Sequence, residues 1–302
     1  MLKVGAVSRN YFNMPLWIAQ QQNFFAAAGL EVAIELHEPI DAVTNRLRDG
    51  ALDLALGVTE HVILDAEAGG RLVILAGNVN RLPFTLVGRP GLRSVADLRG
   101  GKIGVSSVEA GSSSLVMQLL AAHGLEHPRD YTLVACGPIL ARWEKLQAGE
   151  IDAGLQGAPL DHIALDAGYV ALADPRKQFP DFQFTSLNAD RAWAAANRPT
   201  VVAFLRAFVR AHAWFYANRE ASLAIAEAES RIARRYAARA WDEYVADEIF
   251  PRDAAASLPA IQTLIDVSGL IRALPARAAR RVAADYVDVT YLEEARHEES
   301  RR

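Results

Sequence analysis

The chain has 302 residues, enough for two domains of about 150 residues each. With 51% hydrophobic and 23% charged residues it has a globular composition, which excludes disordered, collagen-like and low-complexity proteins. Its 32 basic and 36 acidic side chains give a net charge of -4 without a basic patch, so no nucleic-acid partner is expected. No apolar run approaches the ~20 residues of a membrane-spanning helix, so direct membrane insertion is not expected either.

Short β-branched runs alternate with helical segments over the first 180 residues. The expected strands are 4–7, 32–36, 52–56, 72–77, 84–88, 102–106, 132–136, 151–156 and 169–173. Expected helices include 15–29, 40–50, 94–100 and 112–124, with Pro15 in the first turn of the first one and Gly29, Gly50 and Gly124 as terminators. This alternation predicts an α/β architecture with a mostly parallel sheet.

The pattern changes after about residue 182. One last strand is expected at 182–186, followed by helices at 200–216, 219–237, 240–248, 255–273 and 276–284. In the first of these helices, one apolar face is expected to be formed by Val201, Leu205, Phe208, His212 and Phe215. The charged tail 293–302 is expected to be frayed.

A weak internal echo relates two segments of the chain. Residues 47–61 and 146–162 both read as a helix end, a glycine, a strand and then a glycine-containing loop that leads into another helix. Two loops of the same design, one in each half, suggest two similar lobes.

Motifs of common enzymes are missing from the sequence. Neither a phosphate-binding Walker loop nor a dinucleotide fingerprint nor a GxSxG nucleophile turn is present. His123 and His127 are separated by Gly124, which breaks the helix face that a metal pair needs. The single cysteine, Cys136, is expected to be a small buried side chain. We therefore expect no catalytic residue, no metal and no cofactor.

Polar loops at the carboxyl ends of strands are the best candidates for a binding site, because ligands of open α/β sheets bind there and helix N-termini offer unpaired N–H groups. Four loops qualify. They begin near Ser8, Gly57, Ser106 and Gln156. The predicted ligand-binding residues are Ser8, Asn10, Tyr11, Phe12, Thr59, Glu60, His61, Ser106, Ser107, Glu109, Ser112, Ser113, Ser114 and Gln156.

Several of these residues have a structural alternative. The serines 112–114, which follow Gly111, either cap a helix or contact the ligand, and Thr59 allows the same two interpretations. Tyr11 and Phe12 are expected to line a cleft, with core packing as the alternative for Phe12. Glu60 is expected to accept a hydrogen bond from an amino group of the ligand, with stabilisation of the helix N-terminus as the alternative.

Five segments in series resemble periplasmic substrate-binding proteins of the nitrate/sulfonate/taurine and thiamine-pyrimidine-precursor group. The opening helix carries Pro15, Leu16, Ala19, Phe24, Phe25, Gly29 and Leu30 at the group's positions. GALDLALG, SVADLRGGKIGV, LQAGEIDAGLQGAP and ANRPTVVAFLRAFVRAHAWFYANRE resemble later segments of the group in the same order. The match runs from about residue 3 to residue 225.

The resemblance implies a type II periplasmic-binding-protein fold with two α/β lobes and a ligand cleft between them. One lobe would comprise residues 1–87 and 182–302 and the other residues 88–181, with closure over the ligand. The implied function is capture of a small organic ligand for the permease of an ABC importer, by a monomer. The protein would be periplasmic if a leader has been removed before Met1, and otherwise cytoplasmic.

Related folds also include enzymes, so a cytoplasmic lyase or decarboxylase that uses Glu60 and His61, or Glu109, is the alternative function. The related sulfinate desulfinases use a cysteine in the first loop, and the related fungal pyrimidine synthases use a cysteine-rich motif. This chain has neither. Acids in the cleft would repel an anion unless they point away or pair with Arg9, Arg81 or Arg142. The sequence therefore favours a neutral heterocycle or an amine as ligand.

Overall fold

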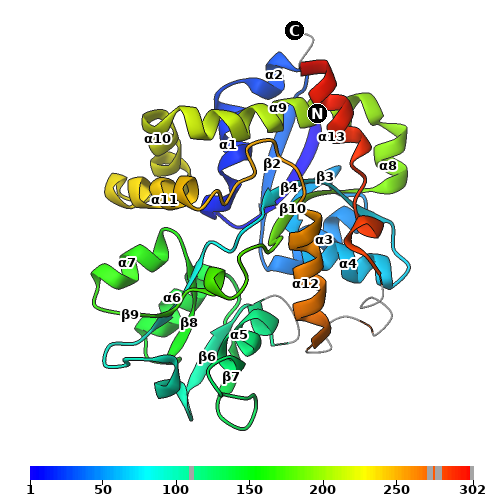
Figure 1. The fold of residues 1–302 in the computed structure, drawn as a ribbon. Coiled ribbons are helices and arrows are strands. Elements are labelled where there is room, and N and C mark those ends of the chain that lie inside the picture. Colours follow the sequence, from blue (N-terminus) through cyan, green and yellow to red (C-terminus); the bar gives the residue numbers. More distant parts are fainter. Residues whose placement is uncertain (109–111, 271–274, 276–280, 300–302) are drawn as a thin grey trace.

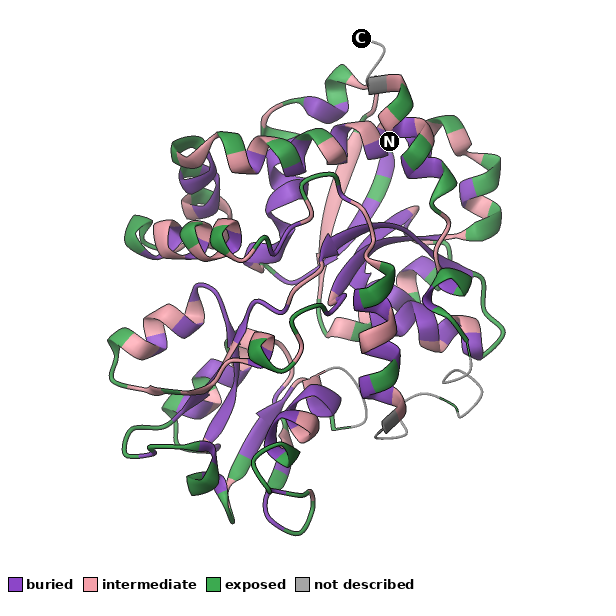
Figure 2. Cartoon of the chain, in the orientation of Figure 1, coloured by how far each residue is buried: buried purple, intermediate pink, exposed green. Residues whose placement is uncertain are grey.

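A computed structural model describes residues 1–108, 112–270, 275 and 281–299. The chain forms two α/β lobes, each built on a five-stranded mixed sheet with helices on its faces (Figure 1). Most strand residues are buried in both lobes, and the exposed residues gather on the outer faces of the helices and in the loops (Figure 2). No helix within the described ranges is long and apolar enough to cross a membrane.

The first lobe has the strand order β2-β1-β3-β10-β4, in which β10 is antiparallel to both of its neighbours. Its strands are β1 (Leu2–Val7), β2 (Val32–His37), β3 (Leu54–Val58), β4 (Leu72–Val79) and β10 (Thr185–Asp190). Its helices are α1 (Met14–Gln21), α2 (Phe24–Ala27), α3 (Ile40–Arg48), α4 (Thr59–Glu67), α8 (Arg191–Ala196), α9 (Arg198–Ala217), α10 (Arg219–Ser230), α11 (Arg234–Ala246), α12 (Leu258–Leu270) and α13 (Thr290–Glu299). Short 3-10 helices are η1 (Tyr11–Asn13) and η5 (Ala283–Tyr286).

The second lobe has the order β7-β6-β8-β5-β9, with β5 antiparallel to β8 and β9. Its strands are β5 (Phe84–Gly88), β6 (Lys102–Val105), β7 (Thr132–Ala135), β8 (Ala153–Gly157) and β9 (Val170–Ala173). Its helices are α5 (Ser112–Ala121), α6 (Ile139–Gln147) and α7 (Leu160–Asp166), with 3-10 helices η2 (Val95–Leu98) and η3 (Pro175–Lys177). The second sheet begins at Phe84, earlier than the residue 88 at which the sequence placed the start of the second lobe.

The chain crosses between the lobes twice, before β5 and before β10. The two crossing segments are hydrogen-bonded to each other: the amide of Phe182 donates to the carbonyl of Asn80 at 3.0 Å, and the amide of Phe184 donates to that of Val79 at 2.8 Å. The two echoed segments occupy equivalent places, α3-β3-α4 in one lobe and α6-β8-α7 in the other. The two-lobe α/β prediction is confirmed.

Several predicted elements need correction. The predicted helix 15–29 is divided into α1 and α2 at Asn23, which has a left-handed φ of 56°. The predicted break between helices after residue 237 lies instead at residues 231–233, where Arg231 has a φ of 55°. The predicted helix 94–100 is the 3-10 helix η2. The last strand starts at Thr185 rather than at residue 182.

The C-terminal tail is also ordered further than predicted. Residues up to 299 continue α13, which packs against α9 and buries Tyr291, Leu292 and Ala295. Most of the helix predicted at 276–284 lies outside the described residues, as do residues 271–273 of the helix predicted at 255–273. The predicted apolar face of α9 is confirmed, since Val201 and Phe215 and the three residues between them at helical spacing are fully buried.

Candidate functional site

A cavity lies between the two lobes, at the carboxyl ends of their parallel strands. It encloses about 520 Å³ of empty space, including the part open to solvent. The first lobe and the second lobe both contribute side chains, together with Phe184 of the crossing segment before β10. The lining residues are Val7, Asn10, Phe12, Ile40, Phe84, Ser106, Ser112, Pro138, Ile139, Arg142, Leu155 and Phe184.

Arg142 is the charged side chain among these lining residues. It extends from α6, is only 3% exposed, and its Nη1 donates a hydrogen bond to the Ser112 hydroxyl at 3.1 Å. Its Nε has no hydrogen-bond partner, and no carboxylate of the described residues lies within ion-pair distance of it. Burial lowers the pKa of Arg142 to about 10, so the guanidinium still carries its charge at neutral pH. A buried cation without a partner is costly, and a bound anion would offset that cost.

Two glycines make room for the stem of this arginine. Gly104 of β6 and Gly154 of β8 are paired in the second sheet, and the methylene groups of Arg142 lie over them. A Cβ at Gly154 would lie 2.9 Å from Cδ of Arg142, and a Cβ at Gly104 would lie 3.1 Å from its Cγ. Side chains at these two positions would therefore block the path by which Arg142 reaches the cavity.

Two serines fix the loop that meets the arginine. The backbone amide of Ser106 donates to Oγ of Ser112 at 2.8 Å, and the amide of Ser112 donates to Oγ of Ser106 at 3.1 Å. Ser112 is the first residue of α5, so the positive end of that helix faces the cavity beside the guanidinium. A hydroxyl, a guanidinium and a helix N-terminus together favour a negatively charged group.

The rest of the cavity is apolar and aromatic. The Phe184 ring meets Phe84 edge-on at a centroid distance of 4.9 Å and meets Phe12 edge-on at 5.7 Å. The loop that carries Phe12 is held by Asn13, whose side-chain amide donates to the carbonyls of Val7 and Ser8. The cavity thus has the Arg142 guanidinium at one side and phenylalanine rings at the other. This arrangement suits a small molecule with an anionic end and an apolar body.

Four of the predicted site residues line this cavity, namely Asn10, Phe12, Ser106 and Ser112. The second predicted loop does not reach it. The Thr59 hydroxyl donates to Ser186, and Glu60 accepts a 2.8 Å hydrogen bond from the Ser268 hydroxyl of α12.

His61 is also directed away from the cavity. Its Nδ1 lies 3.1 Å from the Thr44 hydroxyl, its Nε2 lies 3.4 Å from Asp41, and burial lowers its pKa. For Thr59, Glu60 and His61, these contacts correct the expectation that they face the ligand: they connect α4 to neighbouring elements.

The remaining predicted residues are buried near the cavity or fall outside the described ranges. Ser8, Ser113, Ser114 and Gln156 are buried but do not line it, and Ser107 is half-buried. Tyr11 lines a second hollow next to Pro159, with its ring 4.9 Å from that of Tyr244. Glu109 and Gly111 lie outside the described residues.

The sequence interpretation did not select Arg142, Phe84 or Phe184 as site residues. A signal for Arg142 was present, because Gly137 and Pro138 end a strand and lead into α6 just as the other candidate loops lead into helices. Cys136, beside this turn, is buried as predicted, with its thiol donating to the Val134 carbonyl and with burial raising its pKa.

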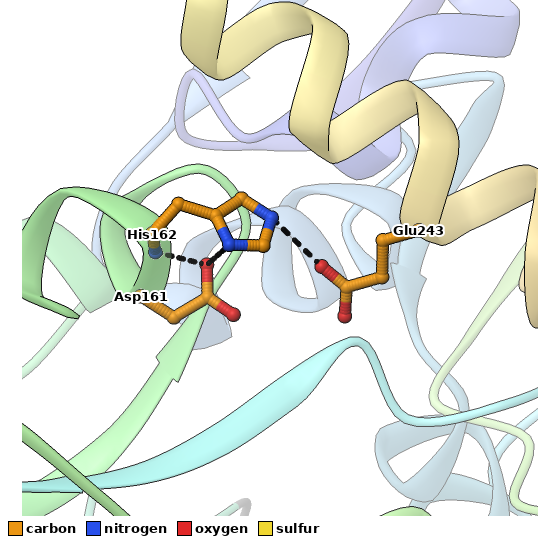
Figure 3. Close-up of side chains that lie close together, drawn as sticks. All are labelled: Asp161, His162 and Glu243. Carbon is orange, nitrogen blue, oxygen red and sulfur yellow. Dashed lines mark hydrogen bonds and ion pairs between the residues drawn. The ribbon is translucent and has the colours of Figure 1, made fainter. Parts of the chain in front are cut away.

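A second cluster of polar side chains spans the lobes next to the cavity. His162 of α7 lies between Asp161 and Glu243, the latter on α11 (Figure 3). Its Nδ1 is 3.8 Å from Asp161 and its Nε2 is 3.1 Å from Glu243, so opposite ring nitrogens face the two carboxylates. A metal ion would bond a single ring nitrogen, and the Arg176 guanidinium already contacts Glu243 at 2.6 Å. These contacts are those of an ion-pair bridge.

Comparison with known proteins places these features in context. Residues 10–222 match the model of a family described as NMT1/THI5 like. A 4-amino-5-hydroxymethyl-2-methylpyrimidine phosphate synthase from Schizosaccharomyces pombe is 32% identical over 170 residues, which are 55% of this chain and 47% of that protein. One from Aspergillus parasiticus is 28% identical over 221 residues, 66% of this chain and 62% of that protein. The match spans about half the length of the first of these relatives.

Solved structures show the same fold over nearly the whole chain. The alkanesulfonate-binding protein SsuA from Xanthomonas axonopodis pv. citri has a TM-score of 0.77 at 21% identity, covering 96% of this chain and 98% of that one. The periplasmic nitrate-binding protein NrtA from Synechocystis PCC 6803 has a TM-score of 0.84 at 16% identity, covering 98% and 88%. The fold is therefore that of the periplasmic binding proteins, as the sequence resemblance implied.

Proposed function

Because the chain belongs to the NMT1/THI5-like family, we propose that it is a solute-binding protein that captures a small organic anion between its lobes for an ABC importer. The fold supports the binding role, and a permease and its ATPase would be the partners. We propose that it works in the periplasm as a monomer.

The buried Arg142 carries this proposal. A fully desolvated guanidinium needs a counter-charge, and the described residues around it supply none. Planar groups with two or three oxygens, such as a sulfonate or a carboxylate, match the fork of N–H donors on a guanidinium. The rings of Phe12, Phe84 and Phe184 would take up the organic part of such a ligand.

The charge of Arg142 changes the ligand class that the sequence favoured. An amine or neutral heterocycle was expected because Glu60 and Glu109 were placed in the cleft, and Glu109 lies outside the described residues. Glu60 is 2% exposed and bonded to Ser268 on α12, so its charge is directed away from the cavity. The cationic side chain that remains among the described lining residues favours an anion.

An enzymatic role like that in the names of the curated relatives is the second candidate. It is supported by 32% identity over about half of the chain. The described lining residues include no carboxylate, histidine or cysteine that could act as an acid, base or nucleophile. A binding role therefore has the stronger support.

A thermal-shift screen tests the proposal with alkanesulfonates, nitrate, short carboxylates, aminopyrimidines and alkylamines as probes. A probe at 100 times its Kd stabilises the protein by about 2.7 kcal/mol, which is about 4 °C for a chain of this length. We expect an organic anion to give this shift in the wild type and none in Arg142→Gln. Arg89→Gln, which removes an exposed arginine paired with Asp152, is the control and should keep the shift. Stabilisation by an amine, or by an anion equally in both arginine variants, would refute the proposal.

A further inference from the structure

The two lobes are joined by charged side chains at a place apart from the ligand cavity. Helix α11 of the first lobe lies next to α7 of the second lobe (Figure 1), and Arg176 of η3 forms ion pairs with α11 and the residue after it. Arg239 pairs with Asp166 at 2.7 Å, and Arg176 pairs with both Glu243 and Asp247 at 2.6 and 2.7 Å. These contacts exist only while α11 and the second lobe are together, so they stabilise the closed arrangement.

His162 occupies the centre of this interface. Its ring fills the space between Asp161, on its own helix, and Glu243, on α11 (Figure 3). The side chains of Asp161, Glu243 and His162 are 2%, 11% and 14% exposed, so the bridge is largely shielded from water. Separation of the lobes would remove Glu243 from the imidazole and bring water to all three groups.

The protonated imidazole is favoured in the closed arrangement. Burial disfavours the charged ring, but the contacts with Glu243 and Asp161 outweigh this effect and raise the pKa of His162 above its usual value. Burial and the charge of Glu243 also raise the pKa of Asp161, to about 6. Both groups thus bind a proton more tightly when the lobes are together. Their contribution to closure is present at low pH and is lost as the pH rises through the raised values.

Other charged and titratable groups face the bridge from each side. Arg176 lies on η3 and Asp174 just before it. Arg239 and Tyr244 lie on α11 and Asp247 just after it, and Tyr11 lies on the first loop. Burial disfavours the charged form of Arg176, but Asp174 and Glu243 outweigh this effect and raise its pKa, so this guanidinium keeps its charge. Burial raises the pKa of Tyr244 and of Tyr11, so neither phenol loses its proton near neutrality. We therefore assign the pH response above pH 6.5 to His162.

We propose that Asp161, His162 and Glu243 form a proton-dependent latch that holds the two lobes together, so that the protein closes in mild acid and opens as the pH rises above neutrality. The role of this latch in ligand retention rests on the proposed binding function. The latch itself concerns only the contact between the lobes.

Small-angle X-ray scattering of the ligand-free protein tests the latch, with the scattering curves fitted as mixtures of closed and open forms between pH 6.5 and 8.5. Because the pKa of His162 is raised in the closed form, the ratio of closed to open protein should fall in the wild type as the pH rises through this range. His162→Gln should abolish the pH dependence and leave the protein more open at pH 6.5. Arg239→Gln is the matched control, because it removes an interlobe ion pair without a histidine: it should reduce closure but keep the fall of closure with rising pH.

Three results would overturn the latch. The first is a constant ratio in the wild type over this range. The second is a wild-type pH response in His162→Gln, and the third is the loss of that response in Arg239→Gln. None of these measurements uses a ligand, so a failure of the anion-binding proposal would leave them unchanged. Conversely, loss of the latch would leave the Arg142-dependent thermal shift in place.

Discussion

Replacing Arg142 by methionine should stabilise the ligand-free protein while abolishing anion binding. Burial moves the pKa of this arginine from 12.5 to about 10, which corresponds to about 3 kcal/mol against the charged form. The variant also loses the 3.1 Å hydrogen bond to Ser112, worth about 1 kcal/mol. Methionine is long and flexible enough to fill the channel over Gly104 and Gly154. The net gain should therefore be about 2 kcal/mol, within the range found when a buried charge is replaced by an apolar group.

Scanning calorimetry of dialysed, ligand-free protein measures this gain. For a chain of this length, 2 kcal/mol raises the Tm by about 3 °C. Arg89→Met, at an exposed arginine paired with Asp152, is the control and should change stability by less than about 0.5 kcal/mol. A Tm below that of the wild type in Arg142→Met would show that the guanidinium is already satisfied without a ligand, and the argument for an anion site would fail.

Three further changes test other parts of the structure. Gly154→Ala places a Cβ 2.9 Å from Cδ of Arg142. It should lower the affinity for the anion identified by the thermal-shift screen by about tenfold, as measured by calorimetric titration. Unchanged affinity would mean that the side chain of Arg142 can reach the cavity by another path. Glu60→Gln should leave that affinity within about twofold and lower the free energy of unfolding by about 1 kcal/mol, because the Ser268 hydroxyl would then donate to a neutral amide oxygen instead of a carboxylate; a large change in affinity would show that Glu60 contributes to the binding site. Burial lowers the pKa of His212 to about 4. The free energy of unfolding should therefore fall by about 3 kcal/mol between pH 6.5 and 4, as the unfolded chain takes up the proton. Urea unfolding of His212→Phe should show a smaller fall over this range, and an equal fall in both proteins would show that His212 does not cause it.

The architecture follows from local signals that the sequence carries directly. Apolar strands alternate with helices, and the terminators Gly29, Gly50 and Gly124 all take positive φ where helices end. The breaks at Asn23 and Arg231 were missed because neither residue type is a strong helix breaker. They adopt left-handed conformations that tertiary packing imposes. The ordered tail was missed because its charges hide the small buried face of Tyr291, Leu292 and Ala295.

The site was only partly predictable, because loop position does not specify side-chain direction. The first and third loops were chosen as helix entries at strand ends, and Phe12, Ser106 and Ser112 do line the cavity. By the same argument Glu60 belongs there, yet its carboxylate turns to α12, a helix about 200 residues later in the chain. Arg142 was considered only as a partner for acids in the cleft and not as a ligand-binding residue, because its function depends on burial, and that burial follows from the two glycines beneath it.

The position of β10 in the first sheet has a consequence for biosynthesis. This strand lies between β3 and β4, and among the described strands it is the partner that β4 pairs with. A ribosome must therefore reach Asp190 before the first sheet can close, whereas every strand of the second sheet has been made once Ala173 emerges. The second lobe can therefore finish folding first, while the edges of β3 and β4 that face β10 in the folded protein remain unpaired. During that interval the nascent chain exposes unpaired backbone groups along apolar strands, which makes it a stage at which chaperone binding would prevent aggregation.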